Sequence, residues 1–220
     1  MSFTRDEIRS AMLLYAVTDR MWLKAGETLP EVVEAVLENG ATFLQIREKD
    51  LAAEAFEREA AQLKALCARH HVPFVVNDSV EIALACGADG VHVGQSDIRG
   101  RDIRAMIGPD KILGISAGTV EEAVAAERAG ADYIGVGAVF GTSTKKDARS
   151  MTVDRLREIA ASVAIPVVAI GGISERNILR LKGSGVDGAA VVSAIFGAAE
   201  PGPATARLLA LSREMVGGCG

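Results

Sequence analysis

A short polar segment carries the residue types that bind a phosphate or diphosphate. Its residues are Gln45, Ile46, Arg47, Glu48 and Lys49, and an apolar run precedes them. If that run is a strand, alternation points Gln45, Arg47 and Lys49 the same way, presenting one amide and two cations. The alternative is a solvated charged loop, because adjacent Arg-Glu and Glu-Lys residues are common on protein surfaces.

Two carboxylates follow the next two apolar runs. Asn77 and Asp78 close the first of these runs, and Asp97 comes shortly after the second. Carboxylates on neighbouring strand ends can hold one hard cation and leave positions for waters and a substrate phosphate, so we expect Mg²⁺ at Asp78 and Asp97. The alternative is that each aspartate caps a following helix, which for Asp78 would start at Ser79.

Two more segments could bind anions. The loop from Gly141 to Ala148 is predicted to form a flap over a site. Its donors are Thr142, Ser143, Thr144 and Lys145. Its residue order is not that of a P-loop, so nucleotide hydrolysis gains no support. Gly172, Val192 and Ser193 close the last two runs, where glycine lets backbone N–H groups approach a monophosphate. Glycines that only permit tight turns are the alternative.

Eight apolar runs must position these residues. They start near Leu13, Thr42, Phe74, Gly90, Ile112, Tyr133, Pro166 and Gly188. Segments of helical periodicity separate them, at 28–38, 52–69, 80–86, 101–107, 120–129, 153–162, 176–182 and 205–216, with a short helical piece at 194–196. Alternating strands and helices predict an α/β fold, a single-domain (β/α)8 TIM barrel over residues 1–220, in which chemistry sits where strands end.

Two features inside this pattern are predicted to be structural. His92 lies between two valines within the fourth run, so we expect it to point into the barrel as a neutral, hydrogen-bonded side chain rather than as a catalytic base. A Gly-Ala-Asp or Gly-Val-Asp turn recurs at 87–89, 130–132 and 185–187. Each precedes a strand, so we expect these turns at the end of the barrel opposite the site.

Composition excludes several classes of protein. The formal net charge is −5 and no broad basic stripe is present, which argues against binding to nucleic acid or to a membrane surface. The three cysteines show no CxxC spacing, so we expect reduced thiols and a cytoplasmic protein. No pattern encodes the oligomeric state, and a homo-oligomer stays open.

The strand-end motifs together resemble one known family. They are YAVTDR (15–20), QIREKD (45–50), VVND (75–78), GADGVHVGQSD (87–97), GIS (114–116), GADYIGVGAVFGTSTKKDA (130–148), PVVAIGGI (166–173) and VDGAAVVSAI (186–195). Across almost the whole barrel the chain resembles the thiamine-phosphate synthase family. The resemblance implies a transferase that joins hydroxymethylpyrimidine diphosphate to hydroxyethylthiazole phosphate with Mg²⁺.

The resemblance also implies residue roles. The pyrimidine diphosphate would contact residues 45–49, Asn77, Ser116 and Lys145, with Arg47, Lys49, Ser116 and Lys145 as catalytic residues. Asp78 and Asp97 would ligate magnesium. The thiazole phosphate would contact Thr142, Ser143, Thr144, Gly172, Val192 and Ser193. The chain departs from many relatives at Val93, Ser96 and the pair Ala117-Gly118, which puts fine substrate contacts in doubt.

Two other functions fit this fold. A thiazole tautomerase-like isomerase relies on a histidine just after the strand-five serine, where this chain has Ala117-Gly118. A non-catalytic sensor of phosphorylated ligands would bind without forming product. The charged residues at successive strand ends favour the synthase over both.

Overall fold

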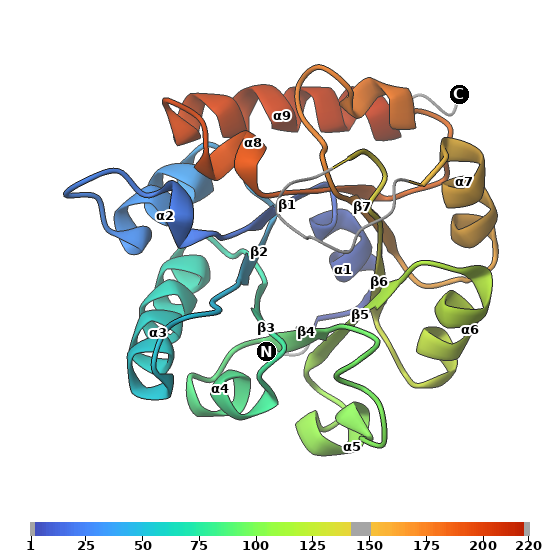
Figure 1. Ribbon diagram of the computed structural model, residues 1–220, viewed down its shortest axis with the longest axis horizontal. Coiled ribbons are helices and arrows are strands. Elements are labelled where there is room, and N and C mark those ends of the chain that lie inside the picture. The colour runs from blue at the N-terminus through green and yellow to red at the C-terminus, as the bar shows by residue number, and fades with distance from the viewer. Residues whose placement is uncertain (1–2, 142–150, 218–220) are drawn as a thin grey trace.

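Eight parallel strands pair in sequence order and close into a barrel within residues 3–141 and 151–217, the part of the chain that the computed structural model describes. Helices lie around the outside of this barrel and connect most strands (Figure 1). The predicted (β/α)8 architecture is therefore confirmed. The strands are β1 Leu14–Val17, β2 Phe43–Ile46, β3 Phe74–Asn77, β4 Gly90–Val93, β5 Ile112–Ala117, β6 Tyr133–Val136, β7 Val167–Ile170 and β8 Gly188–Val191.

The helices of the described residues follow the predicted periodicity with four differences. They are α1 Arg5–Ala11, α2 Leu29–Glu38, α3 Ala53–Arg69, α4 Val80–Ala85, α5 Ile103–Ile107, α6 Val120–Arg128, α7 Val153–Ala161, α8 Ser193–Phe196 and α9 Pro201–Val216, with 3₁₀ turns η1 Arg20–Trp22 and η2 Ile178–Leu181. The helix expected at 176–182 is wrong in type, because its backbone forms i→i+3 bonds such as Arg180 N to Asn177 O at 2.9 Å.

The other three differences are two helix starts and one helix that was not predicted. The helix expected from 205 begins four residues earlier, at Pro201, because proline is compatible with the first turn of a helix. The helix expected from 101 begins at Ile103, after Asp102 caps it. Helix α1 was not predicted, although Thr4 and Glu7 form a reciprocal capping box at its start.

Two apolar layers hold the barrel together. The outer layer joins strands to the surrounding helices, and the inner one fills the barrel itself. Ile8 of α1 and Met12 belong to the inner layer, so α1 packs on the barrel interior from its N-terminal end. Figure 1 shows α1 along the line of sight through the ring of strands. Because Tyr15, Phe43 and Tyr133 fill this interior, the functional groups can lie only at the mouth or just beneath it.

The recurrent aspartate turns form one structural device, as predicted. Asp89, Asp132 and Asp187 each accept a hydrogen bond from a backbone N–H of the first or second residue of a neighbouring strand, at 2.9, 2.7 and 2.7 Å. Each carboxylate also pairs with a cation, from Lys64, Arg104 and Arg9 respectively. These bonds secure strand starts, so the three turns serve stability rather than chemistry.

Within residues 3–141 and 151–217, no helix combines the length and the apolar character that a membrane span requires.

Candidate active site

The second strand turns its one polar residue, Gln45, into the barrel. Gln45 points inward and is only 5% exposed, while Ile46 belongs to the outer apolar layer, so the predicted alternation holds for these two residues. The backbone N–H of Arg47 donates to Thr18 Oγ1 at 3.0 Å, which fixes the chain where it leaves β2. Lys49 extends from the loop beyond and is exposed.

Glu48 lies in a buried ion-pair cluster instead of facing open solvent. Its side chain is 2% exposed, and Arg20 Nε donates to its Oε2 at 2.8 Å. Arg20 also reaches Glu59 of α3 at 2.6 Å. Burial raises the pKa of Glu48, against the lowering effect of Arg20. Sequence reasoning gave no role to Arg20, although its cluster holds the loop that carries Arg47 and Lys49.

The third strand end joins an amide, a carboxylate and the loop after β2. Lys49 Nζ donates to Asp78 Oδ2 at 2.7 Å, and Asn77 Nδ2 donates to Asp78 Oδ1 at 2.8 Å. Asp78 has a φ of +63°, a left-handed conformation that costs energy for most residues and is often found at functional sites. Ser79 caps α4 by accepting from Ile82 N, so the alternative that Asp78 caps this helix is wrong.

The fourth strand end carries Asp97 in a tight turn. Its Oδ2 accepts from Gly94 N at 2.9 Å, and its own N–H donates to Gly94 O at 3.1 Å. The cap of the next helix is Asp102, so the capping alternative for Asp97 is also wrong. Asp78 N donates to His92 O at 2.8 Å, which joins the end of β3 to β4 just before the turn at Gly94. The two carboxylates therefore follow neighbouring strands at the same rim.

Ser116 is the second-to-last residue of β5 and lies beside His92 of β4. His92 Nε2 and Ser116 Oγ are 3.0 Å apart, and His92 is only 9% exposed. The predicted inward, hydrogen-bonded position of His92 is confirmed. Gln95 Nε2 donates to the Ser116 carbonyl at 2.7 Å, so the turn after β4 also supports the end of β5.

The last two strand ends lie together on the opposite side of the mouth. Gly172 has a φ of +66°, and a Cβ at this position would lie 2.8 Å from Phe140 O. Glycine is therefore required there both by conformation and by close backbone approach. Val192 precedes the short helix α8, and the exposed Ser193 is its first residue. The glycine and helix N-terminus expected for a monophosphate are both present.

The predicted flap falls outside the described residues. Thr142, Ser143, Thr144 and Lys145 all belong to this part of the chain. On either side of it the chain is anchored: Phe140 N donates to Gly171 O at 3.0 Å, and Met151 N donates to Ala138 O at 2.8 Å. The residues that flank this segment are therefore held near the ends of β6 and β7.

Fold and site together define a (β/α)8-barrel enzyme with charged groups at successive strand ends. A sequence profile described as thiamine monophosphate synthase matches residues 14–195. Over 183 residues the chain is 50% identical to the thiamine-phosphate synthase of Ruminiclostridium cellulolyticum, covering 83% of this chain and 87% of that one. Identity to the enzyme of Clostridium tetani is 48% over 184 residues, 84% and 88% of the two chains.

A solved structure agrees with these matches. The thiamine phosphate pyrophosphorylase from Pyrococcus furiosus superposes with a TM-score of 0.87 at 39% identity, covering 95% of this chain and 99% of that one. The chain belongs to the thiamine-phosphate synthase family, and it is a transferase.

Proposed function

We propose that the enzyme joins 4-amino-2-methyl-5-(diphosphooxymethyl)pyrimidine to 4-methyl-5-(2-phosphooxyethyl)thiazole, giving thiamine monophosphate and diphosphate. The observation that carries the proposal is the cluster at the ends of β2 to β5, where Lys49 contacts Asp78 and where Asp97 and Ser116 follow on neighbouring strands. The cluster combines cations, carboxylates and a hydroxyl, as a diphosphate with a divalent cation requires.

Magnesium is the cofactor that this donor set fits. Asp78 and Asp97 offer hard oxygen ligands, and Asn77 adds an amide beside the first of them. Asp78 Oδ2 already accepts a positive group, the Lys49 ammonium. Groups of three or more His, Cys, Asp or Glu side chains arranged to hold a metal are absent from residues 3–141 and 151–217, so substrate oxygens and water would complete the coordination. When bound, Mg²⁺ would neutralise charge on the departing diphosphate.

The reaction is a displacement at the pyrimidine methylene carbon. The thiazole nitrogen supplies the electron pair of the new C–N bond, and the C–O bond breaks with its pair going to the diphosphate. The aminopyrimidine ring delocalises positive charge, so C–O cleavage can run ahead of bond formation. Arg47, Lys49 and Lys145 would stabilise the leaving diphosphate, and no nucleophilic side chain is needed.

The substrates divide between the two sides of the mouth. The residues on the pyrimidine side are Gln45, Ile46, Glu48, Asn77 and Ser116. Ile46 and Glu48 would contribute through their backbone, because the Ile46 side chain is buried and the Glu48 carboxylate is paired with Arg20. The thiazole phosphate would occupy the other side. Its residues would be Thr142, Ser143, Thr144, Gly172, Val192 and Ser193. The segment that includes residues 142–145 would close over both and exclude water.

The test is product formation by the purified protein from both substrates, with magnesium or with excess chelator. Formation of thiamine monophosphate and diphosphate in equal amounts with magnesium, and no formation of either product with excess chelator, would support the proposal. Thiazole phosphate binding with no product would favour a sensor instead. Isomerisation of a thiazole carboxylate phosphate would favour the tautomerase, although Ala117 offers no group for proton transfer.

We propose in addition that the protein acts in the cytoplasm on small molecules alone, without nucleic acid or membrane. Its acidic charge of −5 supports this. Assembly into a homo-oligomer is compatible with the proposal.

A further inference from the structure

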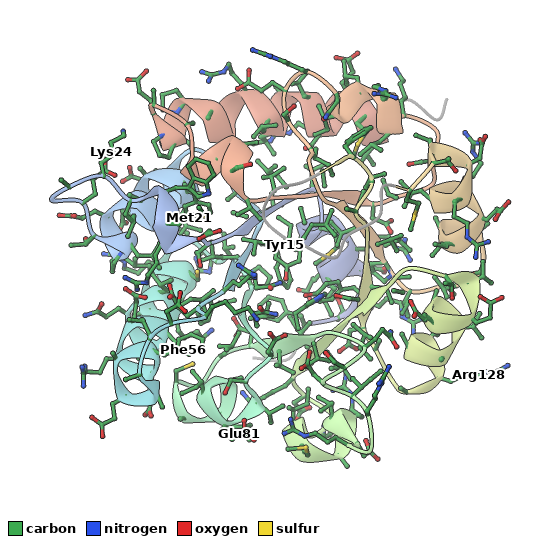
Figure 2. The ribbon with its side chains drawn as sticks, viewed as in Figure 1. Tyr15, Met21, Lys24, Phe56, Glu81 and Arg128 are labelled. Atoms are coloured by element: carbon green, nitrogen blue, oxygen red, sulfur yellow. The ribbon has the colours of Figure 1, made fainter. Side chains whose placement is uncertain are left out.

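A buried chain of polar side chains crosses the barrel beneath the mouth and joins two of the proposed site residues. Gln45 Nε2 donates to Tyr15 Oη at 2.5 Å, and Tyr15 Oη lies 2.8 Å from Tyr133 Oη. Tyr133 Oη lies 3.0 Å from His92 Nδ1, whose other nitrogen, Nε2, lies 3.0 Å from Ser116 Oγ. The chain thus links Gln45 on β2 to Ser116 on β5 through the interior. Figure 2 shows Tyr15 near the centre of the ring of strands.

The surrounding barrel is shaped to accommodate this chain. Tyr15 and Tyr133 are 1% and 0% exposed, and their rings pack with Phe43 at centroid distances of 4.4 and 5.6 Å. Gly114 lies beside the contact between Tyr133 and His92, where a Cβ would fall 2.5 Å from His92 Nδ1. Burying polar groups costs free energy unless they are hydrogen-bonded, and each member of this chain has a hydrogen-bonding partner within it.

The bond from Gln45 to Tyr15 sets a direction with which the other contacts of the chain are consistent. Burial raises the pKa of Tyr15 and of Tyr133 far above neutrality, so each phenol keeps a single proton to donate. Because Tyr15 accepts from Gln45, its proton points to Tyr133, and the Tyr133 proton points to His92 Nδ1. With this direction His92 would carry its proton on Nε2 and donate to Ser116 Oγ.

We propose that Tyr15, Tyr133 and His92 are positioning residues that fix the hydrogen-bonding polarity of Gln45 and Ser116. With His92 donating to it, the Ser116 hydroxyl directs its own proton to the mouth and acts there as a donor. Gln45 donates one N–H to Tyr15 and presents its carbonyl oxygen to the mouth as an acceptor. The pair is thus set to meet one acceptor and one donor of the substrate, as an aminopyrimidine ring provides. This assignment rests on the proposed function, because it places the pyrimidine over Gln45 and Ser116.

The direction of the chain can be measured without any substrate. Protein labelled with ¹⁵N-histidine shows which ring nitrogen of each histidine carries hydrogen, and the His92 signals are those missing from His92→Gln. We expect the Nε2–H tautomer of His92 in the wild-type protein, and loss of its uniform population in Tyr133→Phe. An Nδ1–H tautomer or a doubly protonated ring would overturn the proposal, because Ser116 would then not be left as a donor.

Kinetics test the consequence for the pyrimidine side. Tyr133→Phe keeps the ring and removes the donor to His92, so we expect kcat to fall about tenfold, the lower end of the cost of losing such a supporting hydrogen bond. The KM for the pyrimidine diphosphate should rise, while that for the thiazole phosphate stays unchanged. A smaller folded fraction lowers kcat but changes neither KM. His92→Gln, which keeps an N–H donor, should retain more activity than His92→Leu.

The matched control is Thr205→Val. Thr205 is fully buried and donates to Pro201 O at 2.8 Å within α9, away from the strand ends. The Thr205→Val variant should lose about as much stability as Tyr133→Phe but keep the wild-type kcat and KM values. Equal kinetics in Tyr133→Phe and Thr205→Val would overturn the proposal. A wild-type protein that forms no product would instead refute the proposed function, and the tautomer would still decide the direction of the chain.

Discussion

Two aspartates at opposite ends of the barrel should separate activity from stability. Asp78 follows β3 at the mouth, and Asp187 precedes β8 at the other end. If chemistry belongs to the strand ends alone, Asp78→Asn should lower kcat strongly and leave the stability of the fold almost unchanged. Asp187→Ala should lower the stability of the fold and leave kcat almost unchanged. Asparagine is chosen at position 78 because it tolerates the left-handed backbone found there, with φ +63°.

The structure sets the size of each effect. The Asp78 side chain is 35% exposed and its partner Lys49 is 51% exposed, so losing their ion pair should cost about 0–1 kcal/mol. Losing one preorganised electrostatic contact in the reaction should lower kcat by about two orders of magnitude. Asp187 is 16% exposed and accepts from Val167 N at 2.7 Å and from Arg9 Nη1 at 2.5 Å.

Loss of both Asp187 bonds should therefore lower the free energy of unfolding by about 2 kcal/mol, discounted because Arg9 is 41% exposed. For a chain of this size that corresponds to a drop of roughly 4–8 °C in Tm. The assays are thermal unfolding and steady-state formation of thiamine monophosphate. Near-normal turnover in Asp78→Asn, or a large loss of turnover in a fully folded Asp187→Ala, would refute the reasoning.

Four further substitutions have defined outcomes. Asp97→Ala and Lys145→Ala should each fold normally but lower turnover about a hundredfold or more, as measured by steady-state kinetics beside circular dichroism; normal rates would contradict their roles. Gly172→Ala should raise the KM for the thiazole phosphate more than that for the pyrimidine diphosphate, because its Cβ would crowd a backbone carbonyl at 2.8 Å; equal changes would count against the division of the mouth. Glu48→Gln should alter the pH dependence of unfolding. Burial raises the folded pKa of Glu48, so its contribution is complete below its unfolded pKa and lost as pH rises through the folded value. The stability of the wild type relative to Glu48→Gln should therefore fall as the pH rises above about 4, the unfolded value, in urea titrations, and a constant difference would contradict the shift.

Strand ends and barrel closure could be predicted from the sequence because apolar periodicity and glycine turns are local signals. The eight runs became β1 to β8 in order. Helix starts were less predictable where a proline or a capping pair set them, as at Pro201 and Thr4. Those signals lie outside the apolar pattern.

The site could be predicted as a set of residues but not as a set of contacts. Alternation correctly turned Gln45 inward and placed His92 in the interior. No local pattern showed that Arg20 would pair with Glu48, or that Tyr15 and Tyr133 would join Gln45 to Ser116. These partners are far apart in sequence, and only closure of the barrel brings them together.

A crystal structure with both products bound tests the central assignment most directly. With thiamine monophosphate, diphosphate and magnesium present, the diphosphate should lie against Arg47 and Lys49 with the ion between it and the carboxylates of Asp78 and Asp97. The phosphate of the thiazole half should meet the backbone at Gly172 and Ser193. Both phosphate groups on the Gly172 side, or a metal that contacts neither aspartate, would contradict the account.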